Sequence, residues 1–108
     1  LLAVRQGRGE EALGELAEAT RLEPETSRFA YVYAVALYDL GEPEQAEREL
    51  TEALERMPND PALLELAALR ARDRGDGPAA REFVERLLAM DPGNPEWEGL
   101  GQQTAREN

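Results

Sequence analysis

Residues 41–58, GEPEQAERELTEALERMP, and residues 75–92, GDGPAAREFVERLLAMDP, share residue types at several places in a register of 34 residues (75 − 41). Each stretch begins with glycine, has alanine at its sixth position and ends in proline. The register extends back toward the start of the chain, where the equivalent residues are Gly7, Ala12 and Pro24. A period of this length is typical of repeat proteins, in which each unit packs against its neighbours.

The repeating residues are of the types that begin and end helices. They are the glycines Gly7, Gly41 and Gly75, the prolines Pro24, Pro58 and Pro92, and the residues Thr26, Asp60 and Asn94 that follow the prolines. Glycine permits the turn after a helix, and proline cannot donate to one. The side-chain oxygens of Thr, Asp and Asn accept hydrogen bonds from the free amides of a helix that begins there.

Between these signals the apolar residues have a helical period. The expected helices are 9–22, 26–40, 43–57, 60–73, 77–90 and 95–106, with Leu1 to Gln6 as the end of a truncated helix. No stretch has the alternation typical of a strand, so the fold class predicted is all-α. Short loops make successive helices antiparallel neighbours.

This pattern resembles the tetratricopeptide repeat family, whose unit is a helix–turn–helix pair with a period of about 34 residues. The matching residues are Ala34, Gly41, Ala46, Leu50, Ala53 and Pro58 in one repeat, and Ala68, Gly75, Ala80, Val84 and Pro92 in the next. The chain departs from the family pattern at the leading tryptophan, replaced by Ala30 and Leu64, and at the Leu-Gly pair, replaced by Tyr33-Ala34 and Ala67-Ala68. The remaining positions keep the register.

The resemblance implies a right-handed superhelix of antiparallel helix pairs, forming a single domain over 1–108. Its parts are a truncated repeat 1 (1–26), repeat 2 (27–60), repeat 3 (61–94) and a capping helix (95–106). We expect Trp97 and Leu100 of the capping helix to pack back on the third repeat, before the helix turns polar. Because the sequence starts at Leu1 without methionine, we expect it to be a piece of a longer protein.

The composition leaves few chemical functions open. The 108 residues include no Cys and no His, which removes thiolate nucleophiles, Ser–His catalysis and the usual zinc sites. We therefore expect no enzyme, no cofactor and no metal. The 23 acidic and 12 basic residues give a net charge of −11, which disfavours nucleic acid as a partner. No stretch approaches the roughly 18 apolar residues that would cross a membrane.

In the resembled family, the first helix of each repeat lines a concave groove that receives a peptide. By register, this groove side carries Arg28, Tyr31, Val35, Tyr38, Asp39, Glu65, Leu69 and Arg72, together with Arg5 and Asp73. One subfamily holds a C-terminal carboxylate with Lys and Asn. The chain has Tyr31, Val35, Glu65 and Leu69 at those positions, so this mode of binding is not expected.

Residues 29–38, FAYVYAVALY, are apolar nearly all round the predicted helix, which is more than one buried face requires. We expect Tyr33, Ala34 and Leu37 in the core, and Tyr31, Val35 and Tyr38 facing outward. Two interpretations stay open: the outward residues contact a partner, or further repeats of a longer protein cover them. The acidic run from Glu42 to Glu55 is interpreted as a solvated convex face.

The leading hypothesis is a non-catalytic protein-interaction module or assembly scaffold that binds a peptide or partner protein through an apolar and aromatic groove. The alternative is structural: the chain is one end of a longer repeat array, or a self-associating tail. Its Arg-rich, Lys-free composition resembles repeat tails attached to larger bacterial proteins.

Overall fold

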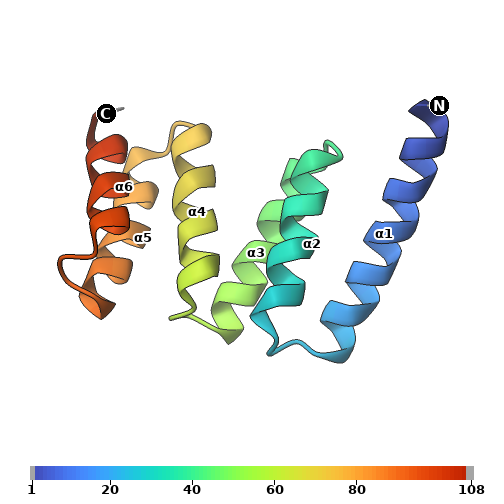
Figure 1. Cartoon of the computed structure of the whole chain (residues 1–108), viewed down its shortest axis with the longest axis horizontal. Helices are drawn as coiled ribbons and strands as arrows, with labels where there is room; N and C mark the ends of the chain where they lie inside the picture. Colours follow the sequence, from blue (N-terminus) through green and yellow to red (C-terminus); the bar gives the residue numbers. More distant parts are fainter. Residues whose placement is uncertain (1, 107–108) are drawn as a thin grey trace. The chain divides into compact units, whose positions relative to one another are not determined.

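The computed structural model describes the backbone of residues 2–106 and the side chains of residues 8–103. The described residues form helices and no strand (Figure 1): α1 (Leu2–Leu22), α2 (Ser27–Asp39), α3 (Pro43–Arg56), α4 (Pro61–Asp73), α5 (Gly77–Met90) and α6 (Pro95–Arg106). The all-α class predicted from the sequence is confirmed, and five of the six helices begin and end within a residue of their predicted bounds.

The helices form two compact units, residues 1–57 and residues 58–108. In unit 1, α2 packs against α1 and α3, and in unit 2, α5 packs against α4 and α6. Neighbours in the sequence run antiparallel within each unit (Figure 1). The pairing of antiparallel helices is therefore confirmed, whereas the right-handed superhelix stays a prediction.

The predicted caps form at two of the three repeating positions. The Asp60 Oδ1 accepts from the Leu63 amide at 3.1 Å, and the Asn94 Oδ1 accepts from the Trp97 amide at 3.3 Å. The prediction is wrong for Thr26, whose side chain makes no cap bond. The amide that this hydroxyl would serve, that of Phe29, donates to the Thr26 carbonyl at 3.2 Å instead.

The turns after α2 and α4 have the same structure. Gly41 and Gly75 both have φ of +81°, a left-handed conformation that favours glycine. After Gly75, the Asp76 amide donates to the Ala71 carbonyl at 2.8 Å, and the Gly75 amide donates to the Arg72 carbonyl at 3.0 Å. These two bonds close the helix end and reverse the chain.

The helix break predicted at Gly7 is wrong, because α1 is continuous from Leu2 to Leu22. The reason lies in the residues that follow each glycine. Gly75 is followed by Asp76, whose Oδ1 caps the Ala79 amide at 3.1 Å. Gly7 is followed by Arg8-Gly9, which supplies neither a capping oxygen nor a proline to start a new helix.

Each unit has an apolar core built from the repeating positions. In unit 1, Tyr33, Leu37 and Ala46 are buried, and Leu13 and Leu16 of α1 pack against them. In unit 2 the buried residues include Leu63, Leu64, Ala80, Val84 and Leu87. Burial of each large side chain stabilises the fold by about 1.5–3 kcal/mol.

The packing predicted for Trp97 and Leu100 of α6 is confirmed in unit 2, and the assignment of α6 as a capping helix stays a prediction. Trp97 and Leu100 are buried, each with 9% of its surface exposed. A Cβ added to Gly101 would lie 3.3 Å from Cγ1 of Val84, so α6 approaches α5 closely there. Trp97 and Leu100 thus pack onto the core that α4 and α5 form.

The caps give a first testable prediction. Asp60→Ala should lower the free energy of unfolding by about 1 kcal/mol, because it leaves the Leu63 amide without its acceptor. Thr26→Ala is the matched control and should change it by less than about 0.5 kcal/mol, since the Thr26 side chain makes no cap bond. Urea unfolding followed by circular dichroism measures both, and equal losses would contradict this account of the two caps.

Candidate protein-interaction site

The predicted groove residues of α2 lie mostly on its outer side. The buried side of the helix carries Ala30, Tyr33, Ala34 and Leu37. The groove residues Arg28, Tyr31 and Asp39 are exposed and Val35 is half-buried. Tyr31 presents 36% of its surface to solvent, although it is large and partly apolar.

Tyr38 does not face outward, and that prediction is wrong. It is half-buried and packs against the cluster that contains Tyr33 and Leu37. α1 also approaches the residue that follows α2, because a Cβ added to Gly9 would lie 2.9 Å from Cδ2 of Leu40. Tyr38 therefore belongs to the packing of unit 1. Arg5 is outside the residues whose side chains are described.

The predicted groove residues of α4 are joined to α6 by hydrogen bonds within unit 2. The Trp97 Nε1 donates to the Glu65 Oε1 at 2.5 Å. The Arg72 Nη1 donates to the Gln103 Oε1 at 2.8 Å, and its Nη2 donates to the Asp73 Oδ1 at 3.3 Å. Leu69 lies between Glu65 and Arg72 in the sequence and is 37% exposed.

A hollow of about 300 Å³ lies at this junction of α4 and α6. The residues that line it are Glu65, Leu69, Pro95, Glu96, Trp97, Gly99, Leu100 and Gln103. The structure thus brings Glu65 and Leu69 together with residues of α6 that the sequence analysis did not include in the groove. The signal was present in the repeat, because Gly99 and Gln103 stand 34 residues after Glu65 and Leu69 (99 − 65 and 103 − 69).

A second hollow, of about 240 Å³, lies in unit 1. Its lining residues are Ala17, Thr20, Arg21, Pro24, Tyr33, Glu49, Glu52 and Arg56. Gln45 Nε2 donates to the Tyr33 hydroxyl at 3.1 Å, and Arg56 Nε donates to the Pro24 carbonyl at 2.9 Å. The Thr20 hydroxyl is buried without a hydrogen-bond partner among the described residues. The Arg56 bond ties the end of α3 to the turn after α1, and the Gln45 bond ties the beginning of α3 to α2.

Burial shifts two titratable groups at this second hollow. It raises the pKa of the Glu49 carboxyl above its ordinary value, and the charge of Glu52 adds to the rise, while Arg56 and Arg48 oppose it. Burial also raises the pKa of Tyr33, with a further contribution from the Glu49 charge. For Glu49 and for Tyr33, burial and the neighbouring negative charge both disfavour the ionised side chain.

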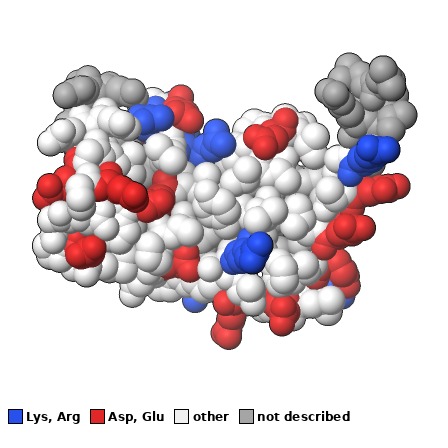
Figure 2. Space-filling model, viewed as in Figure 1, with Lys and Arg blue, Asp and Glu red and all other residues white. Residues whose placement is uncertain are grey.

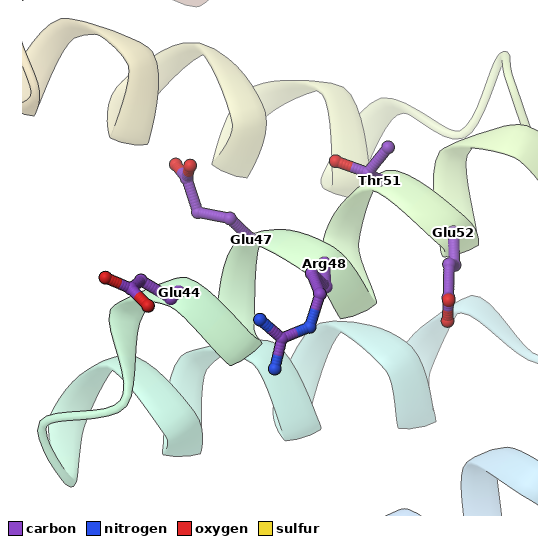
Figure 3. A pocket seen from close by; sticks show the side chains of 5 residues that line it. All are labelled: Glu44, Glu47, Arg48, Thr51 and Glu52. Atoms are coloured by element: carbon purple, nitrogen blue, oxygen red, sulfur yellow. The ribbon is translucent and has the colours of Figure 1, made fainter.

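The acidic residues lie mainly on outer helix faces. Figure 3 shows Glu44, Glu47, Arg48, Thr51 and Glu52 projecting from α3 alone, around a depression of about 400 Å³. Figure 2 shows further acidic side chains along α1 of unit 1. The exposure of Glu42, Glu44 and Glu55 agrees with the interpretation of a solvated face.

Within residues 8–103, no group of three or more Asp or Glu residues is arranged to hold a metal ion. None of the helices described in the chain has the length and apolar character required to cross a membrane.

Antiparallel helix pairs with a 34-residue period define a helical-repeat protein. The comparison with protein families is specific: the model of the tetratricopeptide repeat matches residues 3–70. The match covers more than half of the 108 residues, and the chain belongs to this family.

A search of curated proteins found no match. Tetratricopeptide repeats generally mediate protein–protein interaction or scaffolding, and the family is typically non-catalytic.

The Glu49 carboxyl gives a prediction about pH. Because its pKa is raised in the folded state, folded protein holds this proton more tightly than unfolded protein, and stability falls as pH rises through the two pKa values. Glu49→Gln removes this pH-dependent loss of stability, because glutamine does not ionise. The variant should therefore gain stability relative to the wild type as pH rises from about 4 to 7.

Glu55→Gln is the control for Glu49→Gln, since it removes the same charge from an exposed site on α3. Urea unfolding at several pH values measures both variants. The assigned cause would be contradicted if the stability gained by Glu49→Gln were the same at every pH. It would also be contradicted if Glu55→Gln gained as much stability.

Proposed function

We propose that the protein is a non-catalytic interaction module that binds peptides or segments of a partner protein through two surfaces, the outer face of α2 in unit 1 and the outer face of α4 in unit 2. The observation that supports this most is the exposure of Tyr31 and Leu69, 36% and 37%, on helices whose opposite sides are buried. Aromatic and aliphatic side chains exposed in this way are characteristic contact residues of protein interfaces.

Charged residues border these contact residues in each unit. Arg28 and Asp39 are exposed near the two ends of α2. On α4, Glu65 and Arg72 are held by their bonds to Trp97 and Gln103. Side chains fixed before binding lose less conformational entropy when a partner is bound, so the α4 surface is preorganised.

We further propose that 1–108 acts as one domain with repeats at 1–26, 27–60 and 61–94 and a capping helix at 95–106. The 34-residue register, which runs through all of these segments, supports this assignment. The family match from residue 3 to residue 70 also continues past the end of repeat 2.

A display selection with the immobilised chain tests the proposed function. We expect enrichment of peptides that bind the wild type. Tyr31→Ala should weaken the peptides that bind the α2 surface, and Leu69→Ala those that bind the α4 surface, each by about 1–2 kcal/mol, roughly 5- to 30-fold in Kd. Val32→Ala is the control, because Val32 is 41% exposed on α2 but lies outside the predicted groove register.

The outcomes separate the proposal from its alternative. Peptides that bind both variants as well as they bind the wild type would contradict the assigned surface. Absence of any enriched peptide, together with a wild-type dimer in light scattering that Tyr31→Ala disrupts, would replace the proposal with self-association.

A further inference from the structure

We propose that the hollow between α4 and α6 binds an apolar side chain of a partner segment together with an adjacent Lys or Arg side chain. This inference rests on the proposed function, because it specifies the partner chemistry for the α4 surface of unit 2. The occupant we infer is a peptide segment of another protein, with a basic residue next to a large apolar one.

The apolar component follows from the floor of the hollow. Leu69 is 37% exposed there, and Pro95, Trp97 and Leu100 also line the hollow. Its volume of about 300 Å³ is at the lower end of the range for binding pockets, which suits one or two side chains better than a large ligand. Moving an apolar side chain from water onto this floor is favourable in proportion to the area buried.

The basic component follows from the charges at the edge of the hollow. Glu65 and Glu96 line it, and no Arg is among its lining residues. The bond from Trp97 holds Glu65 in place, and a carboxylate accepts more hydrogen bonds than the one that Trp97 donates. The nearby Arg72 bonds to Gln103 and also to Asp73, whose negative charge offsets its positive charge. A cationic side chain therefore finds complementary charge there.

Gly99 keeps the hollow open. The equivalent positions in the preceding repeats carry Tyr31 and Glu65, whereas this one has no side chain. A Cβ added to Gly99 would meet no atom within 4 Å, so a larger residue fits there without moving the helices. Gly99 also lies inside α6, where residues other than proline favour the helix more than glycine does. A long side chain at this position can thus fill the hollow while the fold is preserved.

Three peptides of about ten residues with blocked termini test the inference on the full chain. In a Gly/Ser background, their central residues are Leu-Arg, Leu-Glu or Ser-Arg, and binding is followed by fluorescence anisotropy. We expect the Leu-Arg peptide to bind at least about tenfold more tightly than either of the others. Raising the salt concentration should weaken this binding, because part of it is electrostatic.

Gly99→Arg and Gly14→Arg form a matched pair of variants. Each adds one positive charge at a helical glycine with open space around it, but Gly14 lies on α1 and is not among the residues that line the hollow. Gly99→Arg should weaken the Leu-Arg peptide at least about tenfold, whereas Gly14→Arg should change its Kd less than about twofold. Circular dichroism melting should show no loss of stability in either variant.

Substitution of Glu65 and Glu96 tests the contribution of charge separately from that of the apolar residues. Glu65→Gln keeps an acceptor for Trp97, and Glu96→Gln is made in the same chain. This double variant should reduce the preference for Leu-Arg over Leu-Glu while it remains folded.

The results that would overturn this inference differ from those that would contradict the proposed function. Equal binding of Leu-Arg and Ser-Arg peptides would show general attraction to an acidic protein and overturn the inference. So would equal weakening by Gly99→Arg and Gly14→Arg, or a Leu-Arg peptide with no measurable binding. If the display selection still yields peptides that depend on Tyr31, the proposed function stands and only the inference about the α4–α6 hollow fails.

Discussion

Every other feature of the chain depends on the burial of each helix's apolar side against a sequence neighbour within its own unit. The turns at Gly41 and Gly75 make this possible, because a left-handed residue there reverses the chain within two or three residues. Ala46 and Ala80, both fully buried, let the paired helices approach closely. Since this packing is between sequence neighbours, each pair forms its core without distant parts of the chain.

The same packing decides which side chains remain for binding. Once Ala30, Tyr33, Ala34 and Leu37 are buried, the helical period leaves Tyr31 outside the buried stripe of α2. In unit 2, α6 has two effects. Trp97 and Leu100 cover the core, and the hydrogen bonds of Trp97 to Glu65 and of Gln103 to Arg72 create a shaped and partly charged hollow beside Leu69. A helix that closes the core therefore also completes a candidate binding surface.

The excess of acidic residues has different consequences at different sites. On outer faces such as that of α3, Glu44 and Glu52 are exposed to water and contribute mainly to solubility. At the second hollow, Glu49 is partly desolvated close to Glu52, so the same residue type there opposes folding at neutral pH. Beside Leu69, the carboxylates of Glu65 and Glu96 offer a partner complementary charge. Burial and neighbours thus decide what each carboxylate does.

The sequence by itself determined the helices, their antiparallel pairing and most of the core, because these depend on local signals: Gly, Pro and cap residues in a 34-residue register, and apolar residues with helical spacing. It also placed Tyr31 and Leu69 on exposed faces. The tertiary structure decided the partial burial of Tyr38 and the contribution of α6 to the hollow. Those outcomes depend on contacts between helices, such as α1 packing against α2 and Trp97 reaching Glu65, and the spacing within one helix carries no information about which neighbour covers it.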